Sequence, residues 1–197
     1  MNRPPLLATL LVGVAIAAMV ALGIWQLRRA EWKEALLARY AAAERLPPVA
    51  WPRTPPADGS LLFRRASGFC LQVVNWSARS GHNRAGQSGW RHIASCRTGA
   101  DGPGMQVDMG WSRNAAAPRG WRGAPVSGVI DADRDHLIML VSDAAAPGLQ
   151  PSARPSPADI PNNHRAYAVQ WFLFAGVALV IYVLALRQRR GRRGGNG

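Results

Sequence analysis

The sequence predicts a membrane-bound α+β protein in which two transmembrane helices, one near each end of the chain, flank a small antiparallel β domain. Residues 6–24 and 166–186 carry almost no polar side chains. At roughly 1.5 Å per residue, each run of about 20 residues is long enough to cross the roughly 30 Å hydrocarbon core of a bilayer. Between residues 61 and 143, short β-favouring runs alternate with turns that contain glycine or proline. The 197 residues leave room for one soluble domain.

The first apolar run has two readings. We expect residues 1–5 in the cytoplasm and residues 6–24 as the first transmembrane helix. A cleaved signal peptide is the alternative, because Ala15-Ile16-Ala17 offers an A-x-A type cleavage site within the run. The run is longer than the apolar part of a typical signal peptide, and residues 25–29 (WQLRR) follow it in place of a cleavage site. We therefore predict an uncleaved anchor.

Helical spacing continues beyond the first span. Apolar residues recur every three or four positions over residues 25–46, which predicts a helix extension outside the membrane. Two proline-rich linkers, residues 47–60 and 144–165, tether the β domain at residues 61–143 to the helices, because proline disrupts helix interiors and central strands. The expected strands are residues 61–67, 69–77, 90–97, 105–112, 126–130 and 136–141.

The distribution of arginine predicts the orientation. The tail at residues 187–197 carries five arginines within seven residues. Positive charge beside a span favours the cytoplasmic side, whereas long loops cross the membrane largely regardless of their charge. We therefore expect a multi-pass protein of the cell inner membrane, with both termini in the cytoplasm and the central domain in the periplasm.

Cys70 and Cys96 are the only cysteines, and each is expected in one of two neighbouring strands. In an oxidising periplasm they can form a cross-strand disulfide bond. The alternative is a pair of buried thiols that pack as small apolar side chains. The spacings typical of thiol-redox enzymes and copper carriers are absent from the sequence.

The sequence contains no motif typical of an enzyme. GxSxG, the Walker loop, HExxH and GxGxxG are all missing. The net charge of +13 comes from arginines spread along the chain, with Lys33 the only lysine, so no nucleic-acid-binding face is indicated. Asp131, Asp133 and Asp135 are interpreted as a solvated turn, and the arginine-rich residues 79–97 as exposed loop charge flanking strand residues. We predict a protein without catalytic residues.

Aromatic, basic and imidazole side chains lie at the predicted membrane edge of both spans. They share one face of each helix and are Trp25, Arg29 and Trp32 on the first helix, and His164, Tyr167 and Trp171 on the second. An imidazole can ligate haem iron, a guanidinium can bind a propionate, and aromatic rings can cover the macrocycle. The alternative is that these residues only anchor the helices at the membrane surface, where such side chains collect.

These residues resemble the signatures of the Surfeit locus protein family of cytochrome c oxidase assembly factors. The N-terminal signature is similar to residues 22–33 (LGIWQLRRAEWK), and the C-terminal one to residues 163–172 (NHRAYAVQWF). A strand that ends in a Gly-Trp pair is similar to residues 107–111 (VDMGW), where Asp108 and Met109 stand in place of the family's usual Asn-Arg.

The resemblance implies an inner-membrane assembly factor that delivers haem a to subunit I of cytochrome c oxidase or stabilises that subunit. It implies haem a as cofactor, bound or passed on, and subunit I, haem a synthase and the lipid bilayer as partners. His164 corresponds to the histidine thought to ligate the haem iron in some members, with Arg29, Trp25, Tyr167 and Trp171 as further haem contacts. The alternative function is a scaffold of the cell envelope that binds protein partners and no haem.

Overall fold

The computed structural model describes residues 6–100 and 104–194. The expected cytoplasmic segment at residues 1–5, residues 101–103 of the connection before the fourth predicted strand, and residues 195–197 of the basic tail lie outside the described residues. The chain forms two compact units. Within the described residues, a helical unit comprises residues 6–36 and 161–194, and a β unit comprises residues 37–100 and 104–160.

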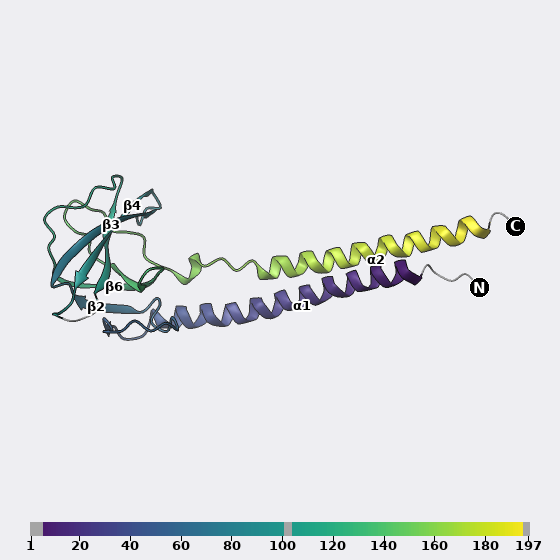
Figure 1. The fold of residues 1–197 in the computed structure, drawn as a ribbon, viewed down its shortest axis with the longest axis horizontal. Coiled ribbons are helices and arrows are strands. Elements are labelled where there is room, and N and C mark those ends of the chain that lie inside the picture. Colours follow the sequence, from purple (N-terminus) through teal and green to yellow (C-terminus); the bar gives the residue numbers. More distant parts are fainter. Residues whose placement is uncertain (1–5, 101–103, 195–197) are drawn as a thin grey trace. The chain divides into compact units, whose positions relative to one another are not determined.

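Two long helices make up the helical unit in the described part of the chain, α1 (Leu6–Ala43) and α2 (His164–Gly194), as Figure 1 shows. The last turns of α1 belong to the β unit. Both helices are long and apolar enough to cross a membrane. In the most apolar stretch of each helix, only 6% of the residues are buried inside the protein. Helices that expose apolar side chains on most sides need an apolar environment, so α1 and α2 associate with a membrane.

The two helices run antiparallel and pack through small residues. Gly23 of α1 lies against the ring of Phe172, where a Cβ atom would come within 2.7 Å of the ring carbons. Ala30 of α1 and Ala168 and Ala175 of α2 are buried. Small residues allow membrane helices to approach closely, because packing rather than water exclusion drives their association.

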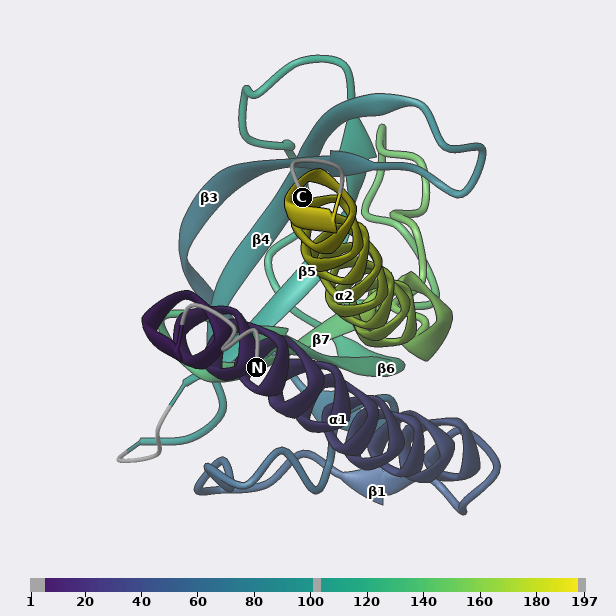
Figure 2. The ribbon, with the colours of Figure 1, turned by 90° about the vertical axis from the view of Figure 1, so that its right-hand side faces the viewer.

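One curled sheet forms the β unit, and the described residues contain seven strands (Figure 2). The strands are β1 (Val49–Ala50), β2 (Arg65–Phe69), β3 (Gln72–His82), β4 (Ser88–Arg97), β5 (Met105–Ser112), β6 (Pro125–Asp133) and β7 (Leu137–Ser142). Their spatial order is β1-β2-β6-β7-β5-β4-β3. The two long helices and a sheet between them in sequence confirm the predicted fold class.

The sheet is mixed, which corrects the prediction of an antiparallel domain. β1 pairs with β2, and β5 with β7, in parallel. After β5, residues 113–124 cross over the position next to β5, and β6 is added one place further along the sheet. The β6–β7 hairpin then places β7 in the position between β6 and β5, parallel to β5.

Several element boundaries differ from the predicted ones. α1 ends at Ala43 rather than at residue 46, and β1 lies inside the first proline-rich linker. Residues 61–64 form a turn in which Phe63 adopts a φ of 63°, so β2 begins at Arg65. The second linker contains a short 3₁₀ helix, Pro157–Asp159, and α2 begins at His164.

β2 and β3 lie near opposite ends of the strand order, yet only Cys70 and Leu71 separate them in sequence. The sheet must therefore curl until its edges meet. At the junction Cys70 donates its backbone N–H to the Ala124 carbonyl oxygen, and Leu71 donates to that of Arg97. The curl encloses the apolar core, whose most deeply buried members include Ile93, Met105, Val107, Ile130, Ile138 and Leu140.

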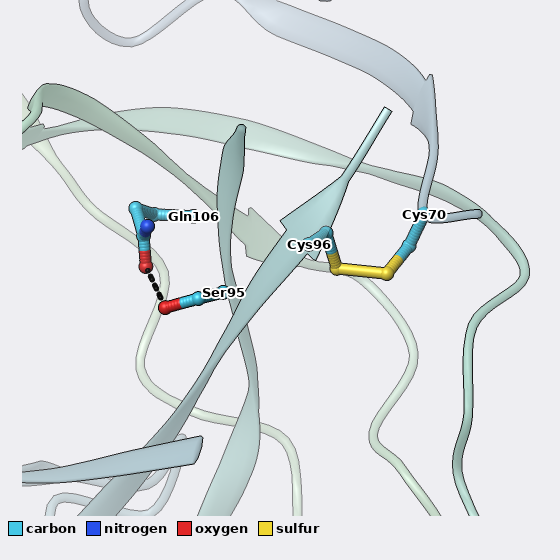
Figure 3. The surroundings of a disulfide bond; sticks show 4 residues. All are labelled: Cys70, Ser95, Cys96 and Gln106. Carbon is cyan, nitrogen blue, oxygen red and sulfur yellow. Dashed lines mark hydrogen bonds between the residues drawn. A yellow bond between two sulfur atoms is a disulfide. The ribbon is translucent and has the colours of Figure 1, made fainter. Parts of the chain in front are cut away.

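A disulfide bond joins Cys70 and Cys96 in this core (Figure 3). Their Cα atoms are 5.2 Å apart, and the residues are 0% and 2% exposed. Of the two alternatives, a disulfide bond or two buried thiols, the structure contains the disulfide bond. Cys70 lies immediately after β2 rather than within a strand, so the bond ties the β2–β3 corner to β4 and holds the curl closed.

Candidate functional site

His164, the candidate haem ligand, begins α2 and contacts α1. Its Nδ1 lies 2.7 Å from Oε1 of Gln26. An amide oxygen can only accept a hydrogen bond, so Nδ1 is the donor, and in the neutral ring Nε2 then carries the lone pair. The ring is half-buried, and Gln26 is its hydrogen-bond partner among the residues that the structure describes. The histidine therefore presents a nitrogen that can ligate a metal.

Further polar contacts fasten the start of α2 to α1 beside this pair. The Arg165 guanidinium donates two hydrogen bonds to the Glu34 carboxylate, each of 2.8 Å. Lys33 Nζ donates to the Pro161 carbonyl oxygen at 2.6 Å. A bidentate ion pair of this kind fixes the relative orientation of the two side chains as well as their distance. These contacts hold the two helices in register at the level of the candidate ligand.

The other predicted haem contacts lie on α1 and α2 within a few turns of this level. Trp25, Trp32 and Tyr167 are 55%, 53% and 49% exposed. Arg29 lies with its guanidinium carbon 4.3 Å from the centroid of the Trp32 ring. Trp171 is half-buried on α2. The structure thus brings His164 to Gln26, a residue of the N-terminal signature that was not predicted to contact it, and leaves the aromatic rings largely exposed.

The residue set fits a haem group. Trp25 directly precedes Gln26, and Tyr167 follows His164 by one turn, so both exposed rings lie within about a turn of the Gln26–His164 contact. Aromatic rings, an imidazole with an open nitrogen and a nearby guanidinium are the groups that hold a macrocycle, its iron and its propionates.

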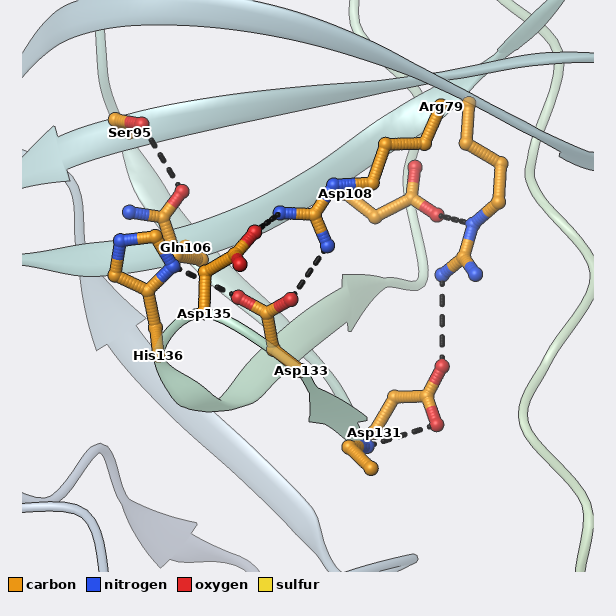
Figure 4. Close-up of polar contacts among 10 residues, drawn as sticks. Arg79, Ser95, Gln106, Asp108, Asp131, Asp133, Asp135 and His136 are labelled. Atoms are coloured by element: carbon orange, nitrogen blue, oxygen red, sulfur yellow. Dashed lines mark hydrogen bonds and ion pairs between the residues drawn. The ribbon is translucent and has the colours of Figure 1, made fainter.

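A polar cluster inside the β unit was not predicted (Figure 4). Asp108 on β5 is fully buried and pairs with Nε of Arg91 on β4. Its Oδ1 also accepts hydrogen bonds from Gly110 N at 2.9 Å and from Ser152 Oγ at 2.8 Å. A buried carboxylate is tolerated only with partners of this kind. The arginine-rich residues 79–97, expected as exposed loop charge, belong largely to β3 and β4.

Arg91 also faces Asp131 of β6, whose carboxylate lies 3.7 Å from the guanidinium. Burial raises the pKa of Asp131, and the charge of Arg91 offsets part of this effect. Both side chains line a cavity of about 270 Å³ together with residues from the 153–160 segment. Nη2 of Arg91 is buried without a hydrogen-bond partner in the described structure.

The predicted solvated turn at Asp131, Asp133 and Asp135 is wrong for two of the three residues. Asp131 and Asp133 lie within β6, and Asp133 is buried. Arg79 of β3 pairs with both Asp133 and Asp135, and His136 Nδ1 lies 2.8 Å from Asp133. Burial acts to raise the pKa of Asp133, but the hydrogen bonds from Arg79 and His136 outweigh it and lower that pKa. Because a guanidinium already satisfies the carboxylates, this cluster is a structural ion network.

The comparisons with known proteins assign the chain to a family. A family model described as the SURF1 family matches residues 13–176, which include most of α1, the whole β unit and the start of α2 with His164. A search of curated protein sequences finds no significant match. Since the family model covers most of its length, the chain belongs to the SURF1 family, which is associated with the assembly of cytochrome c oxidase.

Proposed function

We propose that this protein holds haem a at His164 during the assembly of cytochrome c oxidase, for delivery to subunit I or stabilisation of that subunit. The SURF1 family is a family of assembly factors rather than a known class of enzyme. The observation that carries the proposal is the Nδ1 hydrogen bond of His164 to Gln26, which leaves Nε2 open as a ligand. The haem group would be cargo, and the protein would bind and orient it without catalysing a reaction.

Arg29 is the proposed contact for a haem propionate. No carboxylate pairs with it among the described residues, and its guanidinium stacks on Trp32. Stacking leaves the N–H groups in the guanidinium plane free to bind an oxyanion bidentately. Trp25, Tyr167 and Trp171 would cover the faces of the macrocycle.

We place the protein in the cell inner membrane with two spans and the β unit in the periplasm. The five arginines in the tail support a cytoplasmic C-terminus, and the Cys70–Cys96 bond supports an oxidising compartment for the β unit. A cysteine at the exposed Arg134 should react with a membrane-impermeant maleimide in intact cells. A cysteine at Gln188 should react only after the membrane is permeabilised, and the reverse pattern would overturn this topology.

Subunit I and haem a synthase are the proposed protein partners. Phe69, Leu71 and Val74 are 52%, 57% and 66% exposed at the β2–β3 corner. Exposed apolar side chains gathered at one place on a soluble domain are typical of a protein-binding surface. An exposed apolar surface would also suit the alternative function, a scaffold that binds proteins but no haem. An experiment that depends on haem binding must therefore distinguish the two functions.

The cellular test measures oxidase assembly in a strain that lacks its own family member. The parent protein should restore the haem a signal of the oxidase in isolated membranes. His164→Ala should not restore it, although the variant is inserted normally. His82→Ala, at an exposed histidine of β3, is the matched control and should behave as the parent. Full restoration by His164→Ala would remove the ligand role and favour the scaffold.

A further inference from the structure

We infer that Gln26 is a positioning residue for His164, selecting the neutral tautomer in which Nε2 is free to ligate iron. The inference deepens the proposed haem function and rests on it. It also assigns a task to a residue that touches neither the iron nor the macrocycle in this scheme. The finding behind it is the 2.7 Å contact between Gln26 Oε1 and His164 Nδ1.

The chemical argument concerns the two nitrogens of a neutral imidazole. Only the unprotonated nitrogen can bind a metal, and either nitrogen can carry the proton. In metal sites the non-ligating nitrogen usually donates its proton to a carbonyl or carboxylate oxygen, which fixes both tautomer and ring orientation. The Gln26 amide oxygen stands where such an acceptor is needed. Because the amide is neutral, it also leaves the proton on Nδ1.

The structural argument is that Gln26 is held in place independently of His164. On one side of it along α1, Gly23 packs against the Phe172 ring of α2. On the other side, Lys33 donates to the Pro161 carbonyl oxygen. These two contacts bracket the Gln26–His164 hydrogen bond and fix the helices in the register that it requires. A positioning residue needs such support, since a misplaced acceptor selects no tautomer.

The first measurement is the tautomer of His164 in the full-length protein without haem. The protein, labelled with ¹⁵N in its histidine rings, is studied by NMR in detergent micelles, and His164→Ala identifies the signal. The parent should show protonated Nδ1 and unprotonated Nε2. Gln26→Leu should lose this preference, and Gln26→Glu should keep it because a carboxylate oxygen also accepts a hydrogen bond from Nδ1–H. Gln170→Leu, at an exposed glutamine of α2, is the matched control and should match the parent.

The second measurement is the affinity for haem a, titrated into the parent, Gln26→Leu, Gln26→Glu and Gln170→Leu. Loss of such an acceptor lowers metal affinity by about tenfold or more, so Gln26→Leu should bind about tenfold more weakly and Gln26→Glu nearly as the parent. An unchanged tautomer in Gln26→Leu would overturn the inference, even if affinity fell, because the residue would then be merely structural. Absence of haem a binding in the parent would instead overturn the proposed function, while the tautomer data would still decide the positioning role.

Discussion

Asp108 on β5 and Arg91 on β4 form an ion pair in the interior of the β unit, where the Asp108 side chain is wholly buried and that of Arg91 is 19% exposed. Removal of one partner from such a pair leaves an uncompensated charge in the core. The pair also connects the sheet to the segment that leads to α2, because Ser152 donates to Asp108.

Asp108→Ala should therefore destabilise the β unit by about 3 kcal/mol or more. Chemical unfolding of the detergent-solubilised protein, followed by tryptophan fluorescence, measures this loss. The double variant Asp108→Leu with Arg91→Met should recover part of the stability, because it removes both charges of the buried pair together. Equal stability of Asp108→Ala and the parent would show that the pair contributes nothing.

His92 makes the stability of the β unit sensitive to pH. It is 1% exposed on β4, and burial lowers its pKa below the ordinary value of 6.5, with Asn114 and Asp108 offsetting only part of the effect. The unfolded chain therefore binds the proton more readily than the folded protein. The free energy of unfolding should fall as the pH drops below about 6.5, until the pH reaches the folded pKa.

Urea unfolding at several pH values between roughly 7.5 and 5 checks this expectation, because these values lie on both sides of the ordinary pKa of histidine. His92→Gln should flatten the curve, since its side chain does not titrate. His82→Gln, at an exposed histidine of β3, is the control. A parent whose stability does not change over the range would contradict the assignment.

The Cys70–Cys96 bond should stabilise the β unit by about 3 kcal/mol, because it closes a loop with a sequence separation of 26 residues. The double variant Cys70→Ser with Cys96→Ser should unfold at correspondingly lower urea. Since both residues are buried in the core, the native bond should also resist reductant until the domain unfolds. Rapid reduction under native conditions, detected by thiol alkylation and mass shift, would contradict this location.

Gly23 controls how closely α1 and α2 approach. A side chain at this position would meet the Phe172 ring, so Gly23→Val should separate the helices and lower the thermal unfolding midpoint in detergent. Gly13→Val is the matched control, because a Cβ at that position would meet no side chain and no part of another element within 4 Å. Adding Phe172→Ala to Gly23→Val should restore the midpoint. Equal midpoints for the two valine variants would show that the close approach does not matter.

The helices and most strands could be predicted because their signals are local. The apolar runs at residues 6–24 and 166–186 both lie within helices, and β5 has the predicted bounds of 105–112. The parallel β5–β7 pairing has no such signal, since it depends on how a hairpin 20 or so residues later returns to the sheet. Likewise, the residues near Leu61 favour a strand by composition, but the backbone of Phe63 adopts the left-handed conformation and turns the chain there.

The site was predictable only in part, for the same reason. His164 and the aromatic residues stood out by type and position, whereas Gln26 acquires its role from a partner 138 residues away. Asp133 looked like part of a polar turn, but Arg79, 54 residues earlier in the chain, pairs with it in the folded sheet. Asp108 carried one local signal, because it is the only charged residue of β5, and a charged residue buried in a strand requires a partner.

The central claim, haem a ligation by His164, is tested most directly by the reduced-minus-oxidised visible spectrum of the purified protein. Parent and His164→Ala are expressed in a host that makes haem a and purified in detergent. A haem a band in the parent that is lost in His164→Ala, but kept in the His82→Ala control, is the predicted result. A band of equal strength in parent and His164→Ala, or no band in the parent, would contradict the account.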